Sequence, residues 1–139
     1  MTNAILAPVM VLMLITILVW MLLFVRRLNE VMVKRINAQD LATPEQVTAL
    51  LSERAQAPAN CLKNLFELPV LFYALVSFLL LTGKVDGLYI NLAWGFVILR
   101  SLQALVHCTY NRVQHRFFAY ISGSLILWGM IIRFALSVI

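Results

Sequence analysis

The chain has 139 residues, of which 63% are hydrophobic and only 12% are charged, and its net charge is +5. A soluble domain carries about a quarter charged residues, and the apolar residues here are gathered in long blocks, so the composition excludes a soluble globular protein. The basic excess does not indicate a nucleic-acid-binding protein, because the basic residues gather beside the apolar blocks, where membrane topology accounts for them.

The first apolar block, residues 4–25, contains no charge and is long enough to cross a hydrocarbon core of about 30 Å. We expect it to be a membrane span and not a cleaved signal peptide, because no basic residue precedes it and no small-residue cleavage site follows it. The longest connection, residues 26–57, comes next. Within it, segment 43–46 has a capping threonine and a first-turn proline, which predicts a short amphipathic helix reaching Arg54.

Three further apolar blocks follow, at residues 58–82, 88–110 and 117–138, and Pro58 is expected to begin the first of these. Continuous runs of this length predict helices, since a closed barrel needs short alternating strands. The last two connections have only a few residues, so neighbouring helices are expected to pack antiparallel. We predict an all-α fold, an integral membrane four-helix bundle that forms a single membrane domain over residues 1–139.

Lysine and arginine are divided unevenly between the connections. The first and third connections hold several each, whereas the second holds only Lys84. The positive-inside rule therefore predicts that the first and third connections are cytoplasmic and that both termini of this multi-pass protein are non-cytoplasmic.

The second span contains a polar stripe at helical spacing. Its members are Asn60, Lys63, Asn64 and Glu67. Ionisable groups within a span are costly and usually face a bundle interior or a watery cavity, so they are candidates for a functional site. Pro69 lacks the amide that would bond the Leu65 carbonyl and is expected to kink the helix beside this stripe.

The third span carries a second polar stripe, and the fourth begins with an arginine. These residues are Arg100, Gln103, His107, Tyr110 and Arg116. The predicted topology brings all of them to the cytoplasmic half, beside the first stripe. Glu67 is the only acid there, so the pocket suits an anionic ligand that carries one cationic group. The charge of Arg116 adds to the positive end of the helix dipole and suits a thiolate.

Simpler readings of several residues remain open. Lys63 and Glu67 are four apart, and this spacing also fits a structural ion pair. Arg133 is expected to snorkel from the outer end of the fourth span. Cys61 and Cys108 are interpreted as apolar fillers, because their spacing is not that of metal ligands, and no metal site is predicted.

The segment Asn64-Leu65-Phe66-Glu67, followed by Pro69, resembles the second-helix Asn-x-x-Glu motif of the MAPEG family, the membrane-associated proteins of eicosanoid and glutathione metabolism. Lys63, Arg100 and Arg116 also fall where family members carry basic residues, and the resemblance covers essentially the whole chain. It implies a homotrimer that binds glutathione between neighbouring subunits, with Asn64 and Glu67 on the polar backbone and amino end, and Lys63 and Arg100 on the carboxylates.

The resemblance further implies glutathione transferase-like or peroxidase-like activity, with glutathione as co-substrate and Arg116 stabilising its thiolate. An apolar small-molecule substrate would arrive from the membrane lipid. The candidate binding residues are Asn60, Lys63, Asn64, Glu67, Arg100, Gln103, His107 and Tyr110.

Several positions depart from the family pattern. Asn60 stands where an arginine is usual, and His107 stands near the position of a third-helix tyrosine, which Tyr110 would have to replace. The alternative is therefore a non-catalytic membrane subunit or a lipid-binding protein with the same fold. A small transporter is disfavoured because the spans are short and lack paired broken helices. The short connections are typical of bacterial members, which predicts a bacterial inner membrane protein.

Overall fold

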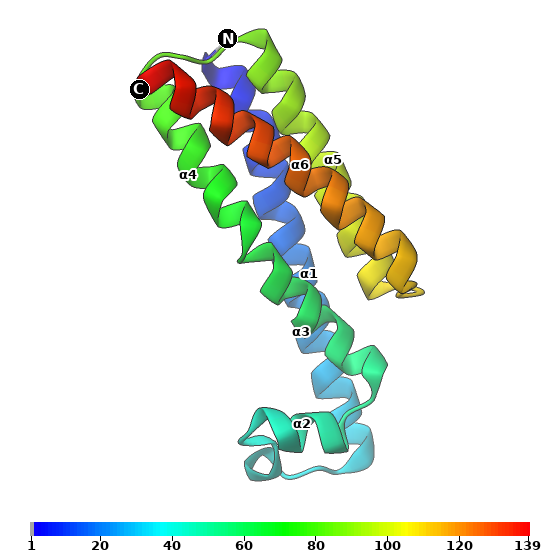
Figure 1. Ribbon diagram of the computed structural model, residues 1–139. Coiled ribbons are helices and arrows are strands. Elements are labelled where there is room, and N and C mark those ends of the chain that lie inside the picture. Colours follow the sequence, from blue (N-terminus) through cyan, green and yellow to red (C-terminus); the bar gives the residue numbers. More distant parts are fainter. Residues whose placement is uncertain (1) are drawn as a thin grey trace.

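A computed structural model describes residues 2–139, which form helices joined by short connections (Figure 1). The helices of the bundle are α1 (Leu6–Lys34), α3 (Glu53–Leu65), α4 (Leu68–Leu81), α5 (Gly87–Cys108) and α6 (Val113–Val138). Three short elements complete the chain: the 3₁₀ helices η1 (Thr2–Ile5) and η2 (Ala38–Leu41), and helix α2 (Pro44–Leu50).

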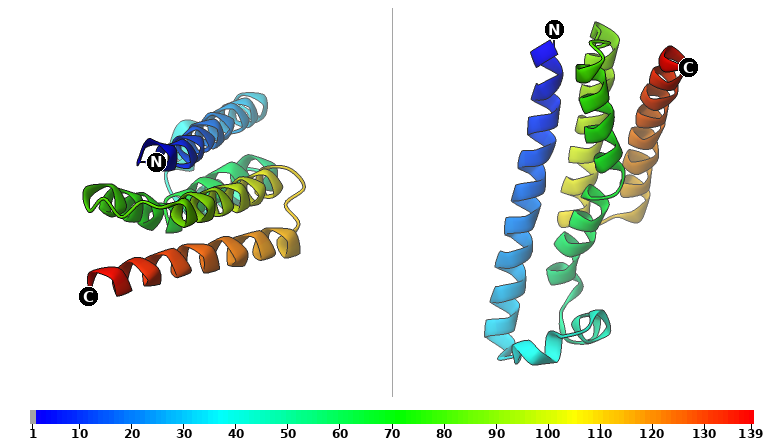
Figure 2. Two further views of the ribbon diagram at one scale, coloured as in Figure 1. Left: turned by 90° about the horizontal axis from the view of Figure 1, so that it is seen from above. Right: turned by 90° about the vertical axis from the view of Figure 1, so that its left-hand side faces the viewer.

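The helices are arranged in three layers, with α1 on one side, α6 on the other, and α3, α4 and α5 between them (Figure 2). Phe72 of α4 and Phe96 of α5 pack in the middle layer, with ring centroids 4.8 Å apart. Leu12 of α1 and Leu127 of α6 are fully buried against this layer from opposite sides. The two termini lie together at one end of the bundle.

Four helical stretches in residues 2–139 are long and apolar enough to cross a membrane: Thr2–Lys34, Glu53–Leu81, Gly87–Cys108 and Val113–Val138. Many large apolar side chains on their outer faces are exposed, as lipid-facing side chains are. The predicted all-α, four-helix membrane architecture is confirmed, and the protein is a multi-pass integral membrane protein.

Several predicted helix bounds are wrong by up to about two and a half turns. Helix α1 continues to Lys34, so the connection predicted over residues 26–57 is much shorter. The second span begins at Glu53, capped by the Ser52 side chain, and Pro58 lies inside this helix and does not start it. The predicted amphipathic helix ends at Leu50 as α2, with the expected capping box at its start, and Arg54 belongs to α3.

Pro58 is tolerated inside α3 because Arg26 supplies a replacement hydrogen bond. A proline at this position has no amide to donate to the carbonyl four residues earlier, which is that of Arg54. Arg26 Nη1 donates to this carbonyl at 3.2 Å, and its Nη2 donates at 2.8 Å to the carbonyl of Cys108, the last residue of α5. One guanidinium thus joins α1, α3 and α5 at the end of the bundle that carries most of the arginines, here called the basic end.

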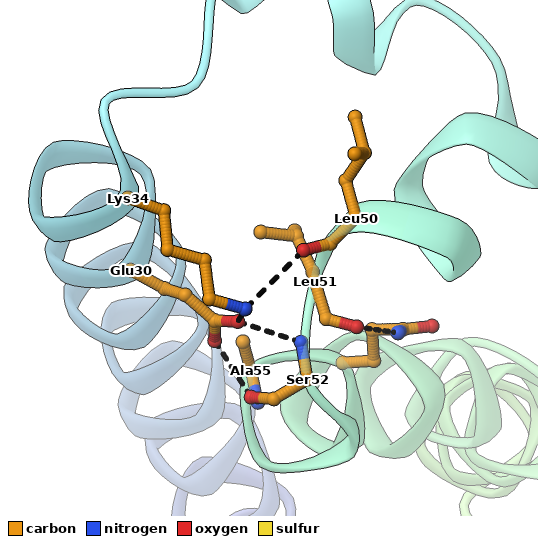
Figure 3. A network of polar contacts seen from close by, with 7 residues as sticks. Glu30, Lys34, Leu50, Leu51, Ser52 and Ala55 are labelled. Carbon is orange, nitrogen blue, oxygen red and sulfur yellow. Dashed lines mark hydrogen bonds and ion pairs between the residues drawn. The ribbon is translucent and has the colours of Figure 1, made fainter.

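A second polar network fastens α1 to the start of α3 at the basic end (Figure 3). The Glu30 carboxylate accepts hydrogen bonds from the Ser52 amide at 2.7 Å and the Ser52 hydroxyl at 2.6 Å, and it pairs with Lys34 at 2.7 Å. A carboxylate at a helix N-terminus is favoured by the helix dipole. Arg26 and Glu30 therefore hold α1 and α3 together where these two helices extend past α5 and α6.

The opposite end of the bundle is closed by Arg133, the residue expected to snorkel from the outer end of the fourth span. Its guanidinium binds Asp86, the N-cap of α5, through two hydrogen bonds of 3.1 and 2.6 Å, and lies 4.3 Å from the centroid of the Tyr89 ring. Lys84 donates to the Ser137 carbonyl beside this pair. The connection between α4 and α5 is thereby attached to the end of α6.

Candidate functional site

A helix break beside Pro69 positions the second-span polar stripe. Helix α3 ends at Leu65, and α4 begins at Leu68 with Pro69 in its first turn. The missing amide of Pro69 cannot bond the Leu65 carbonyl, which is the physical reason for the predicted kink. Glu67 is therefore the residue before a new helix, and its backbone is not helical.

The break places Glu67 in an open cleft with side chains from three helices. The cleft has a volume of about 380 Å³ and is lined by Asn60, Lys63, Asn64, Glu67, His107 and Arg116. We call it the polar cleft. The first three residues come from α3, His107 from the last turn of α5 and Arg116 from the first turns of α6. Six of the nine predicted site residues thus lie together, although the stripes are far apart in sequence.

The charges of the polar cleft are not neutralised within the chain. Among residues 2–139 the ion pairs are Glu30–Lys34 and Asp86–Arg133, both outside the cleft. Lys63 and Glu67 are exposed and form no ion pair with each other, so the simpler structural reading of these two residues is wrong for this chain. Two cations and one carboxylate therefore remain available for a ligand.

His107 is the buried member of the polar cleft. Its side chain is 4% exposed, and its Nδ1 atom has no hydrogen-bond partner among the described residues. Leaving a buried polar atom unpaired costs about 1–3 kcal/mol, and such groups are rare enough in proteins to need an explanation.

Arg116 is half-buried, and its guanidinium is oriented by the turn between α5 and α6. Its Nη1 donates to Oδ1 of Asn111 at 2.7 Å. The residue lies in the first turn and a half of α6, where the unpaired amides at the helix start also favour an anion.

Arg100 and Gln103 lie outside the polar cleft, in the interface between α5 and α6. Arg100 is 1% exposed, and its Nη1 donates to Gln103 Oε1 at 2.7 Å. Its Nη2 is 3.4 Å from Ser124 Oγ, and its guanidinium carbon is 4.7 Å from the centroid of the Tyr120 ring. Arg100 therefore contacts α6, Gln103 contacts Arg100, and neither residue lines the cleft.

Tyr110 also lies away from the polar cleft. Helix α5 ends at Cys108, so Tyr110 belongs to the turn and not to the predicted helical stripe. Its hydroxyl is 2.8 Å from Nδ1 of His115, and its side chain lines a separate cavity of about 300 Å³ at the basic end, together with Arg26, Glu53 and Asn111. Sequence reasoning missed Asn111, whose position just before the fourth span was the available signal.

Comparison with known families places the chain. A sequence model of the MAPEG family matches residues 5–136, which is nearly the whole chain. The searches found no matching curated protein and no matching solved structure.

Proposed function

Because the chain belongs to the MAPEG family, we propose that it is a membrane-embedded protein that binds glutathione in the polar cleft and uses it in a transferase-like or peroxidase-like reaction. The observation that carries this proposal is the gathering of Lys63, Glu67 and Arg116 in one cleft without an ion pair between them.

The charges of the cleft complement those of glutathione. The tripeptide has two carboxylates, one ammonium group and peptide amides. Lys63 and Arg116 offer cations, Glu67 offers the one carboxylate, and Asn60 and Asn64 offer amides that both donate and accept. The cleft volume of about 380 Å³ lies within the range of about 300–1,000 Å³ for small-molecule sites. In this proposal Glu67 binds the ammonium group and Lys63 binds a carboxylate.

Arg116 is assigned to the glutathione sulfur. A nearby cation and a helix N-terminus both favour a thiolate over a thiol, and the thiolate is the reactive nucleophile. In conjugation, the sulfur pair forms a bond to an electrophilic carbon, and the leaving group departs with the electrons of its own bond. In the peroxidase reaction, two glutathione thiols give one disulfide, and the hydroperoxide takes their two electrons and two protons to become an alcohol and water.

The exposure of the cleft supports an oligomer with the cleft at a subunit boundary, and we propose the homotrimer that family membership implies. Asn60, Lys63 and Glu67 are exposed on the single chain, although they lie within the stretch Glu53–Leu81, which is long and apolar enough to cross the membrane. Polar groups in a span are costly against lipid, so a second copy that covers this face removes that cost. An apolar second substrate would then enter the boundary from the lipid.

The orientation follows from the basic end. Placing Arg26, Arg54 and Arg116 toward the cytoplasm satisfies the positive-inside rule and leaves both termini on the other side. The cleft then opens toward the compartment where reduced glutathione is present, in agreement with a protein of the bacterial inner membrane.

The test is titration of reduced glutathione into the purified protein in detergent, followed by calorimetry and by turnover with an apolar electrophile. We expect binding by the wild-type protein and a loss of turnover of about tenfold or more in Arg116→Ala, since a positioned charge of this kind contributes at least that much. Arg112→Ala is the matched control, because Arg112 is exposed and lies outside the cleft. Absence of binding at millimolar glutathione, or turnover unchanged in Arg116→Ala, overturns the proposal.

A second candidate is a lipid-binding protein without catalytic activity. It is favoured by Tyr110, which stands in the turn with its hydroxyl bonded to His115 and leaves the cleft with His107 in place of a tyrosine. Mass spectrometry of the native protein distinguishes the two functions, since a co-purified phospholipid that glutathione does not displace supports the second.

A further inference from the structure

The turn between α5 and α6 is built around Asn111. Its φ angle of 48° lies in the left-handed region, which asparagine tolerates better than most residues other than glycine. Its backbone amide donates to the Val106 carbonyl at 2.7 Å, so the turn closes directly onto the last turn of α5. This backbone conformation fixes the position and direction of the Cα–Cβ bond of Asn111.

The Asn111 side chain reaches the cleft arginine. Oδ1 accepts a 2.7 Å hydrogen bond from Nη1 of Arg116, and this contact is partly buried. Arg116 lines the polar cleft, whereas Asn111 lines the neighbouring cavity that contains Glu53. Asn111 therefore holds the guanidinium without itself lining the cleft.

The chemistry of this contact differs from that at Arg133, at the opposite end of the bundle. Arg133 is held by the carboxylate of Asp86, which cancels its charge. Arg116 is held by a neutral amide, and within residues 2–139 it forms no ion pair. An amide oxygen orients a guanidinium through a charge-assisted hydrogen bond and leaves its positive charge available.

We propose that Asn111 is a positioning residue, which fixes the Arg116 guanidinium toward the polar cleft without neutralising it, so that the charge acts on the sulfur anion of the bound ligand. This inference rests on the proposed binding of glutathione. It adds that the neutrality of residue 111, as well as its hydrogen bond, is required.

Two substitutions separate these requirements. Asn111→Gly keeps a residue that accepts the left-handed backbone but removes the amide oxygen. Asn111→Asp keeps both the backbone preference and an oxygen acceptor but adds a negative charge beside Arg116. Gln114→Glu is the matched control, because it adds the same charge in the first turn of α6 at an exposed residue outside the cleft.

The measurement is the ultraviolet difference absorbance of the glutathione thiolate on the full-length protein, recorded against pH, with calorimetric affinity beside it. We expect the thiolate population at neutral pH to fall about tenfold in Asn111→Gly, the effect of losing one charge-assisted hydrogen bond. Asn111→Asp is expected to lose it at least as strongly, and Gln114→Glu is expected to match the wild type. Affinity for the tripeptide is expected to change less than the thiolate signal.

The outcomes separate this inference from the proposed function. If Asn111→Gly or Asn111→Asp forms as much thiolate as the wild type, the proposed role of Asn111 is overturned. The proposed binding of glutathione is then unaffected. Thiolate loss in Gln114→Glu as large as in Asn111→Asp also overturns it, because any added charge would then suffice. A wild-type protein that binds no glutathione overturns the proposed function and this inference together.

Discussion

Arg100 is the largest fully buried side chain of the protein, and no carboxylate pairs with it among the described residues. Its charge is accommodated by neutral partners, since Gln103 and Ser124 accept its hydrogen bonds and the rings of Phe96 and Tyr120 lie over the guanidinium. A lysine has neither the planar fork of donors nor the flat face that a guanidinium offers to an aromatic ring. Arg100 therefore joins α5 to α6.

We predict that Arg100→Lys lowers the free energy of unfolding in detergent by about 1–3 kcal/mol, because one of the two acceptors loses its donor in a buried place. Thermal unfolding followed by circular dichroism measures this change. Arg112→Lys at an exposed position is the control and is expected to be neutral. A stable Arg100→Lys protein that has lost glutathione binding would instead support the carboxylate contact that the family resemblance implies.

At the scale of elements, the two prolines of the second span have opposite effects. Pro58 leaves α3 continuous because Arg26 donates to the carbonyl that Pro58 cannot reach. Pro69 is accompanied by a break, after which the chain resumes as α4 with Glu67 before its first turn. The break is what allows Glu67 to line the polar cleft with the residues of α3.

We predict that Pro69→Ala extends the helix through residue 67 and moves the Glu67 carboxylate out of the cleft. Proline disfavours a helix interior by about 3 kcal/mol relative to alanine, so the substitution removes the main local obstacle. Glutathione affinity is expected to fall by about tenfold, the change that 1.4 kcal/mol produces, without loss of thermal stability.

Pro44→Ala is the control for this prediction, since Pro44 stands at the start of α2, outside the cleft. Calorimetry on the two variants is the measurement. Equal affinities in Pro69→Ala and the wild type would contradict the assignment of Glu67 to the ligand.

At the scale of the molecule, separate polar fastenings close the two ends of the bundle. Glu30 and Ser52 join α1 to α3 at the basic end, and Asp86 and Arg133 join α5 to α6 at the other. The hydrogen bonds from Arg133 hold the pKa of Asp86 below its usual value. A lowered pKa stabilises the folded state above the unfolded value of about 3.9, and this contribution is lost as pH falls through the folded value.

We predict that Asp86→Asn lowers the melting temperature slightly at neutral pH. The difference from the wild type is expected to shrink as pH falls below about 4 and to disappear below the lowered pKa of Asp86, where the wild-type carboxyl is protonated too. Asparagine can still cap the N-terminus of α5, so the substitution tests the loss of the charge separately from the loss of the cap. Asp40→Asn, in an exposed connection, is the control. A melting difference that is the same at every pH would contradict the role of the charge.

The fold could be predicted from the sequence because uncharged blocks of span length permit few alternatives in a membrane. The kink at Pro69 could be predicted from proline chemistry, and the meeting of the second-span stripe with His107 and Arg116 could be predicted from alternating helix direction. The helix bounds near Pro58 could not, because the donor that replaces its amide comes from Arg26 in another span.

The limits of the site prediction have similar causes. Arg100 and His107 belong to the same predicted stripe, yet they face different neighbours, because the rotation of α5 depends on its packing against α6. The place of Tyr110 depends on where α5 ends, and sequence periodicity does not define helix ends closely. Asn111 has meaning only through its backbone angle and its contact with Arg116.

The contacts of Arg26 have a consequence for how such a chain can change over generations. Its charge is one of those that would orient the protein in the membrane. Its two donor groups also bond to backbone carbonyls of α3 and α5. A substitution that weakened the orientation signal here would also remove the donors to the Arg54 and Cys108 carbonyls. Membrane orientation and helix packing therefore both depend on this one residue. A variant that tolerated the loss of Arg26 would first need a residue other than proline at position 58, so that its backbone amide could donate to the Arg54 carbonyl.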